Sequence, residues 1–341
     1  MDEGSAAELH GRAYVFDAHS DNFIDVAWYR SAGERQVMER RHLPEARAGG
    51  VDAVVIGITA ERVYKPYQAL PRVLQLLGAG LEDLAESPQF FRIVREGADF
   101  ARASQAGQIA VVLQLEGGEP VEYSTESLRV FWEVGIRSLI PAWSYSSRLA
   151  TGAWDYSSGG GLTPLGEQMV REANRLGVVI DVSHLAPTAV SHVLRVTRRP
   201  VIASHSNAAA LHPHPRNLPD DLIKAIAGTG GVIGIASVDL FLAREGASIE
   251  HVVQQIEYLL DLVGDRHVGL GLDMNPWEYR LHEVATSGDH KPLRGGRVEG
   301  FSEWRDLPAL TNRLLQRGHS ETTIRNILGE NFRRFYAEAL S

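Results

Sequence analysis

Short, nearly continuous apolar runs alternate with longer amphipathic stretches along this chain, and no other feature constrains the fold as strongly. The runs are rich in β-branched residues, which is typical of strands that are buried on both faces. They occupy residues 13–16, 53–58, 110–115, 138–140, 178–180, 201–203, 232–235 and 268–272. Several runs follow a glycine that suits the end of a helix, such as Gly135 and Gly177. The pattern predicts eight parallel strands separated by helices.

Some of the helices between these strands can be located. Thr163-Pro164 provides an N-cap followed by proline at the first helical position, and a helix is expected over 166–176. Helical spacing also covers the segments 219–227, 249–263, 303–317, 320–328 and 330–340. Eight strands alternating with helices favour an α/β fold of the (β/α)8 TIM-like barrel type. The alternative is an open Rossmann-like sheet, which is disfavoured because no glycine fingerprint opens the first helix.

The chain of 341 residues shows no repeat or linker, so we expect one domain over 1–341 with the barrel over about 12–340. A long polar segment, about 274–300, is expected to form a loop over the site. The net charge of −9 argues against binding to nucleic acids or anionic membranes. The start of the sequence lacks a secretory pattern, so a cytoplasmic location is expected. His10 is expected to lie in a frayed N-terminus.

Polar residues that can bind metal follow five of the eight runs. On an extended strand, residues i and i+2 point to the same side, so His19 and Asp21 can aim at one point. The other candidates follow the third, fifth, sixth and eighth runs: Glu116, His184, His205 and Asp273. Each residue alone could be structural, as a core histidine or a carboxylate near a helix start. Together they predict a metal site at the C-terminal ends of the barrel strands.

The chain contains no cysteine, so any metal must be held by histidine and carboxylate side chains. Such ligands suit zinc and its first-row neighbours. Apart from Asp273 there are five candidate ligands, which are too many for one catalytic zinc that keeps an open position. They suit two metals about 3.5–4 Å apart that share a carboxylate and make hydroxide available at neutral pH. Asp273 could then accept and return a proton.

These residues resemble the zinc-dependent membrane (renal) dipeptidases and their bacterial relatives, within the metal-dependent amidohydrolase-like barrels. The similarity covers roughly residues 12–340. It is carried by Phe16-Asp17-Ala18-His19-Ser20-Asp21, Leu115-Glu116-Gly117-Gly118, Asp181-Val182-Ser183-His184, Ser204-His205-Ser206-Asn207, Arg216-Asn217-Leu218-Pro219-Asp220-Asp221, Val268-Gly269-Leu270-Gly271-Leu272-Asp273 and Leu328-Gly329-Glu330-Asn331-Phe332.

The resemblance implies two zinc ions per chain and a role for each ligand. His19 and Asp21 would hold one zinc, and His184 and His205 would hold the second. Glu116 would bridge the two metals, and Asp273 would handle the proton. Arg216 matches the arginine that binds the substrate's C-terminal carboxylate, for which a guanidinium fork is well suited. The family also implies a dipeptide-like substrate, tolerance of a D-residue at its C-terminal position, and frequent pairing of barrels into homodimers.

Two positions depart from the family pattern. The fourth strand of the family ends in a histidine that polarises the scissile carbonyl or its oxyanion, and Trp143 stands at this position. An indole donates one hydrogen bond and cannot carry an imidazolium charge. Tyr145 could supply a hydroxyl near the substrate instead. After Asp273 the chain continues Met274-Asn275-Pro276, where the family usually has a second aspartate and a glycine.

Three functions therefore remain open at the level of the sequence. The first is a binuclear zinc hydrolase that cleaves dipeptides by attack of a metal-bridging hydroxide. The second, motivated by Trp143, is a related amidohydrolase that acts on another amide, a lactone or an ester, or in a biosynthetic step. The third is a metal-stabilised binding protein without catalysis, which the retained Asp273 and Arg216 disfavour.

Overall fold

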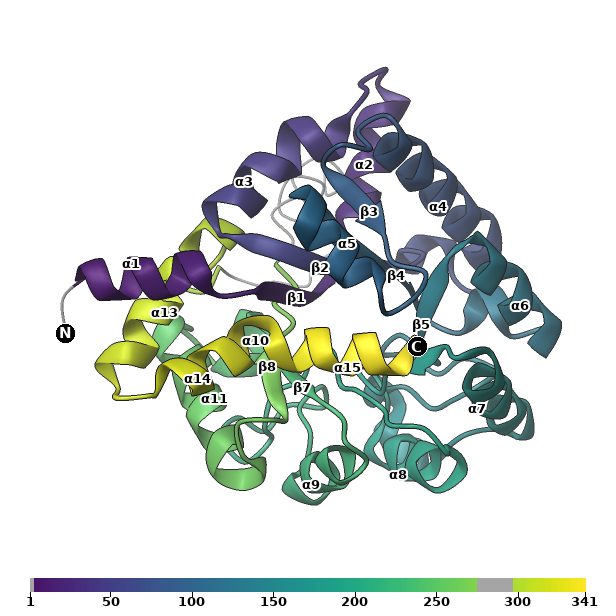
Figure 1. The fold of residues 1–341 in the computed structure, drawn as a ribbon. Coiled ribbons are helices and arrows are strands. Elements are labelled where there is room, and N and C mark those ends of the chain that lie inside the picture. Colours follow the sequence, from purple (N-terminus) through teal and green to yellow (C-terminus); the bar gives the residue numbers. More distant parts are fainter. Residues whose placement is uncertain (1–2, 275–296) are drawn as a thin grey trace.

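The core of the fold is a parallel β-sheet that curves into a ring (Figure 1). A computed structural model describes residues 3–274 and 297–341. The strands follow one another around the ring in the order β6-β5-β4-β2-β1-β8-β7. Their bounds are β1 Val15–Ser20, β2 Val51–Ile58, β4 Ile109–Glu116, β5 Ile136–Ile140, β6 Val179–Ile180, β7 Ile233–Ile235 and β8 Val268–Leu270.

Residues 201–203 close the ring between β6 and β7. Parallel bridges join Asp181 to Ile202 and Ala203 to Ile233. The amide of Ile202 donates to the carbonyl of Ile180 at 3.1 Å, and the amide of Gly234 donates to the carbonyl of Ala203 at 2.8 Å. The segment forms bridges rather than a regular strand, but it occupies the sixth barrel position. The TIM-like barrel is therefore confirmed, and the open Rossmann-like alternative is wrong because this segment leaves no open edge between β6 and β7.

One strand was not anticipated from the sequence. The short strand β3 (Phe91–Ile93) pairs in parallel with the first residues of β4, whereas β5 pairs with the last residues of β4. Both strands use the edge of β4 that β2 leaves open. Three residues are too few to show a hydrophobic period, so the sequence pattern gave no signal for β3.

Helices surround the ring and cover the outer faces of the strands (Figure 1). The described residues form the α-helices α1 Glu3–Arg12, α2 Asn22–Ser31, α3 Leu43–Ala48, α4 Ala69–Ala85, α5 Asp99–Ala106, α6 Thr125–Val134, α7 Pro164–Leu176, α8 Pro187–Val196, α9 Asp220–Gly228, α10 Asp239–Leu242, α11 Ile249–Val263, α13 Leu307–Gln316, α14 Glu321–Arg325 and α15 Asn331–Ala339. The expected cap of α7 is present, since the Thr163 hydroxyl accepts a bond from the Gly166 amide at 3.0 Å.

The N-terminal helix is fixed to the barrel rather than frayed. His10 is buried in α1, and its Nδ1 atom lies 2.7 Å from the hydroxyl of Thr311 in α13. Its Nε2 atom lies 3.0 Å from the carbonyl of Gly49. The expectation for His10 was wrong because these two partners are distant in sequence and gave no local signal.

The inside of the barrel changes from apolar to polar along each strand. In β4, alternate residues Ala110, Val112, Gln114 and Glu116 share one face, as the two-residue period requires. Ala110 and Val112 belong to an apolar cluster with residues of α15. That helix contributes Phe332 and Tyr336, which fill the N-terminal mouth of the ring. The polar residues Gln114 and Glu116 therefore lie toward the opposite mouth.

Within the described ranges, no helix is long and apolar enough to cross a membrane. The expected loop over about 274–300 falls largely on residues 275–296, which lie outside the described residues.

Candidate metal centre

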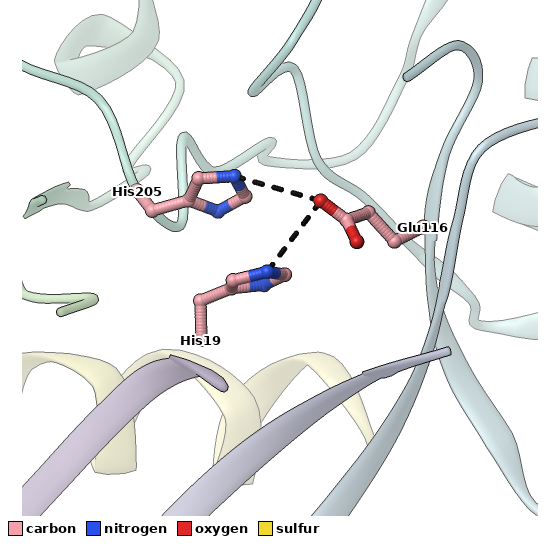
Figure 2. Close-up of side chains that lie close together, drawn as sticks. All are labelled: His19, Glu116 and His205. Carbon is pink, nitrogen blue, oxygen red and sulfur yellow. Dashed lines mark ion pairs between the residues drawn. The ribbon is translucent and has the colours of Figure 1, made fainter. Parts of the chain in front are cut away.

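The ends of strands that are far apart in sequence bring two histidines and a glutamate together. His19 lies near the end of β1, and Glu116 is the last residue of β4. Figure 2 shows the rings of His19 and His205 facing the same carboxylate oxygen of Glu116. The Nε2 atoms of His19 and His205 lie 3.5 Å and 3.9 Å from this oxygen, Oε1. Together the three side chains offer ligand atoms within 4.8 Å of one another.

His184, which follows β6, adds a third imidazole to this group. Its Nε2 atom lies 2.9 Å from Oε1 of Glu116 and 2.8 Å from Nε2 of His205. Two nitrogens that bind one tetrahedral zinc at its usual bond length lie about 3.3 Å apart. A small outward movement of His184 and His205 would therefore open the space that a shared ion requires.

Two aspartates also lie close to His19. The Oδ1 atom of Asp21 lies 3.7 Å from Nε2 of His19. Asp273 joins these two residues in a second group whose ligand atoms lie within 4.8 Å of one another. Its backbone amide donates to the carbonyl of His19 at 3.2 Å, which ties the end of β8 to the end of β1. His19 thus belongs to both candidate ligand groups.

The protonation of these groups is governed mainly by burial. Burial lowers the pKa of His19 to about 3 and places the pKa values of His184 and His205 well below their ordinary value. All three rings are therefore neutral at pH 7, which is the form that binds metal. Burial, followed by the charge of Asp273, raises the pKa of Glu116 to about 8. A cation in the cluster would favour the charged carboxylate and reverse this shift.

Each imidazole is oriented by a hydrogen bond to its Nδ1 atom. His19 donates to Oε1 of Gln114 at 3.2 Å. The hydroxyls of Ser144 and Ser204 lie 2.7 Å from Nδ1 of His184 and His205, respectively. These contacts leave the Nε2 atoms directed at Glu116. Outer partners of this kind commonly fix the tautomer and orientation of metal-binding histidines.

Gln114 is the most connected of these outer residues, and the sequence analysis did not identify it. Its side-chain amide donates to the carboxylate of Asp181 at 2.8 Å and to the hydroxyl of Ser138 at 2.9 Å. The other carboxylate oxygen of Asp181 accepts from the backbone amide of Ser204 at 3.0 Å. The available signal was a polar residue in an apolar strand, two positions before Glu116 and therefore on the same face.

Two candidate residues adopt unusual backbone conformations. His184 and Asp273 have φ angles of 68° and 53°, a region that residues with side chains rarely occupy. Ser144, the partner of His184, has a φ angle of 51°. Such strain concentrates at functional sites, where the surrounding structure holds it in place. The burial and hydrogen bonds of Ser144 supply that support here.

Arg216 lies next to the cluster and is almost completely buried. Its Nη2 group donates to the carbonyl of His205 at 3.2 Å, and its guanidinium lies over the ring of Phe241 at 5.2 Å. Burial lowers the pKa of Arg216 to about 10, whereas the charges of Asp273 and Glu116 oppose this shift. The Nε–H group has no hydrogen-bond partner among the described residues. A buried cation with a spare donor is suited to bind a carboxylate.

The aromatic residues expected near the substrate form a cluster that contacts His184 through Trp143. The ring of Trp143 stacks on His184 with centroids 5.7 Å apart, and it meets Trp154 edge to face with centroids 5.9 Å apart. Tyr145 packs against Trp154 at 4.9 Å. Lys65, which the sequence analysis did not identify, lies over the ring of Trp143, with Nζ 4.7 Å from its centroid. Its position depends on the loop after β2, for which the sequence pattern gave no signal.

The nitrogen and oxygen atoms of this cluster are better suited to bind a metal than to hydrogen-bond only with one another. Nε2 of His19 and Oε2 of Glu116 are buried without a hydrogen-bond partner in the part of the chain that the structure describes. Buried polar atoms without partners are unfavourable and uncommon. Neutral imidazoles and a carboxylate at this spacing are typical zinc ligands. The site is therefore suited to zinc or a similar ion.

The comparisons with known proteins agree with this geometry. Residues 3–340 match the family model described as Membrane dipeptidase (Peptidase family M19). Dipeptidase verJ from Clonostachys rogersoniana is 29% identical over 245 residues, which make up 71% of this chain and 58% of that protein. The metallo peptidase known as dipeptidase AC has a solved structure that is 25% identical, with a TM-score of 0.82 over 96% of this chain and 99% of its own.

A solved metallo peptidase from Rhodobacter sphaeroides, bound to a phosphinate mimic of the dipeptide L-Ala-D-Ala, has the same fold. It is 24% identical, with a TM-score of 0.82 over 96% of this chain and 99% of its own. The family resemblance carried by the sequence motifs is confirmed by the match over residues 3–340. The chain therefore belongs to the membrane dipeptidase family, the metal-dependent dipeptide hydrolases with an amidohydrolase-like barrel.

Proposed function

We propose that this protein is a binuclear zinc dipeptidase. The observation that carries the proposal is the position of Glu116, whose Oε1 atom lies within 3.9 Å of the Nε2 atoms of His19, His184 and His205. In this proposal His19 and Asp21 would hold one zinc, and His184 and His205 would hold the second. Glu116 would be shared by the two ions. When bound, a zinc pair of this kind lowers the pKa of water and supplies hydroxide at neutral pH.

The remaining residues position the substrate and move its proton. Arg216 binds the C-terminal carboxylate of the dipeptide, because its buried guanidinium retains a donor. Asp273 lies beside His19 and Asp21, where its carboxylate can accept a proton and later deliver it to the leaving amine. Trp143 and Tyr145 form the side wall of the pocket. The D-residue seen in the dipeptide mimic of the Rhodobacter sphaeroides peptidase supports tolerance of a D-residue at the C-terminal position.

Metal analysis combined with a dipeptide screen tests this proposal. Purified protein should contain about two zinc ions per chain, as the two ligand groups require. It should hydrolyse dipeptides with a free C-terminal carboxylate, including members with a C-terminal D-residue. Glu116→Gln should lose both metal content and turnover. Inactivity of the zinc-loaded protein across L,L and L,D dipeptides would refute the dipeptidase assignment.

A second function is favoured by Trp143, which occupies the position of the family histidine. The scaffold could be directed toward another amide, a lactone or an ester, or toward a biosynthetic step. In that case Trp143→His should raise dipeptide turnover, because the imidazole restores a polarising group. Unchanged or lower turnover would remove the reason for this alternative. A homodimer and a cytoplasmic location stay predictions that follow from the sequence.

A further inference from the structure

Lys65 is a buried cation beside the proposed reaction centre. It directly follows the short helix η2 (Arg62–Tyr64), in the connection between β2 and α4. Its side chain is 10% exposed, and its Nζ atom lies 3.0 Å from Oε1 of Glu119, which is itself 7% exposed. Glu119 begins the short helix η3 (Glu119–Val121), three residues after Glu116. The ammonium is therefore held at the same mouth of the barrel as the candidate metal ligands.

Two further contacts define where the ammonium points. Nζ lies 4.7 Å from the ring centroid of Trp143, whose ring stacks on His184. A side chain at Gly117 would begin 3.4 Å from Nζ. Lys65 therefore lies between Trp143 and the residue next to Glu116. The charge of Lys65 also acts on the cluster: it opposes the rise that burial causes in the pKa of Glu116 and adds to the fall that burial causes in the pKa of His184.

The donor capacity of Lys65 is not exhausted by these contacts. An ammonium carries three donors, and Lys65 Nζ is buried without a well-directed hydrogen bond among the described residues, although it forms an ion pair with Glu119. A buried ammonium normally satisfies its donors, because unpaired ones are costly. The arrangement leaves a cationic donor available to a group that enters the site.

We propose that Lys65 is a catalytic residue that donates a hydrogen bond to the carbonyl oxygen of the scissile amide. This inference deepens the proposed dipeptidase function and rests on it. As hydroxide adds to the carbonyl carbon, the π electrons of the C=O bond move onto that oxygen, and the Lys65 ammonium stabilises its charge without giving up a proton. When the C–N bond breaks, the electrons return to the carbonyl and the amine leaves with the proton that Asp273 delivers.

The proposal explains how a chain with Trp143 at the family's histidine position could keep its activity. The indole cannot donate a charged hydrogen bond, but its face supports the ammonium through a cation–π contact. Glu119 holds the same ammonium through an ion pair. Arg216 and Lys65 then have separate tasks: Arg216 binds the terminal carboxylate, and Lys65 stabilises the oxyanion.

The test compares zinc-loaded wild type with Lys65→Met, which keeps the apolar stem, and with Lys65→Arg, which keeps a cation. Kinetics on a dipeptide substrate are combined with calorimetric binding of a phosphinate mimic of L-Ala-D-Ala, whose tetrahedral anion resembles the transition state. Lys65→Met should lower kcat by roughly 10²- to 10³-fold with little change in KM, and should weaken phosphinate binding similarly. Lys65→Arg should retain part of both. Zinc content should be the same in all three proteins.

A double variant separates this role from a purely structural ion pair. Lys65→Met leaves the buried Glu119 without its partner, whereas Lys65→Met/Glu119→Gln removes both charges. If Lys65 only neutralises Glu119, the double variant should regain activity, and that result would overturn the proposal. A loss confined to KM, or a change in kcat below about threefold against the 10² expected from an oxyanion donor, would overturn it as well.

The activity of the wild type distinguishes failure of the proposed dipeptidase function from failure of the role of Lys65. Wild type that neither cleaves dipeptides nor binds the phosphinate would refute the dipeptidase function, and the role of Lys65 with it. Active wild type with an equally active Lys65→Met would refute only the role of Lys65.

Discussion

Replacing Gln114 with leucine removes the residue that connects the candidate metal ligand His19 to neighbouring barrel strands. The side chain is completely buried. It accepts a bond from His19 at 3.2 Å and donates to Ser138 at 2.9 Å and to Asp181 at 2.8 Å. Leucine has a similar volume, so the substitution removes hydrogen bonds without opening a large cavity.

The effect can be estimated from these three contacts. At roughly 1 kcal/mol net for each bond, Gln114→Leu should lower the free energy of unfolding of the metal-free protein by about 3 kcal/mol. Loss of the partner of His19 Nδ1 also frees the ring to rotate and to change tautomer. Outer-partner substitutions of this kind lower metal affinity roughly 10- to 100-fold, which corresponds to about 1.4–2.7 kcal/mol.

Two measurements check this reasoning. Urea unfolding of the metal-free protein, followed by circular dichroism, reports stability, and competition with a chelator reports zinc affinity. Ser138→Ala is a matched control, because it removes only one bond of Gln114, and it should cost about 1 kcal/mol and alter zinc affinity little. If Gln114→Leu changed zinc affinity less than about threefold, against the 10-fold minimum expected, the orienting role of Gln114 would be refuted.

Three further predictions concern the ligands and the substrate. Because burial and Asp273 raise the pKa of Glu116 to about 8 while the histidines stay neutral, a proton on Glu116 competes with zinc below that pH. Zinc affinity, measured by chelator competition, should therefore rise by about tenfold per pH unit up to about pH 8 and level off above it. If the affinity instead levelled off from about pH 5, Glu116 would already be ionised there and the expected competition would be refuted. Arg216→Lys should lower kcat/KM for dipeptides by roughly 10- to 100-fold, since a charged bidentate contact is lost. An equal loss with a C-terminally amidated dipeptide, which lacks the carboxylate, would show that Arg216 does not act by binding that carboxylate. Trp143→His should raise kcat more in the Lys65→Met background than in the wild type, and equal effects in both backgrounds would mean that the two residues do not share the oxyanion.

The sequence predicted the features that depend on strand periodicity. His19, Glu116, His184 and His205 all follow apolar runs, and the parallel barrel necessarily brings the C-terminal ends of its strands to one rim. The structure places these side chains together for that reason, although their roles as zinc ligands stay predictions. The expected barrel was recognised even though residues 201–203 form only isolated bridges, because their apolar character matched that of the regular strands.

The features that were missed depend on contacts across the fold. Lys65 reaches Trp143 and Glu119 from a loop whose course no local pattern encodes. His10 is buried by partners in α13 and before β2, so its position next to the chain terminus was misleading. Gln114 is different, because its place in an apolar strand was a usable signal. A polar side chain that shares the inner face with a candidate ligand is a good candidate for its outer partner.

The seam between the first and last strands has a consequence for biosynthesis. β1 pairs with β8, Asp273 bonds to the backbone of His19, and Asp17 of β1 is held by the amide of Leu272 and the indole of Trp304. A ribosome-bound chain that has not yet emerged beyond residue 267 has His19 but lacks both β8, which pairs with the strand of His19, and the carboxylate of Asp273. If the site holds zinc as proposed, the full complement of metal should therefore bind only after synthesis, and nascent chains should bind it weakly until β1 and β8 have paired.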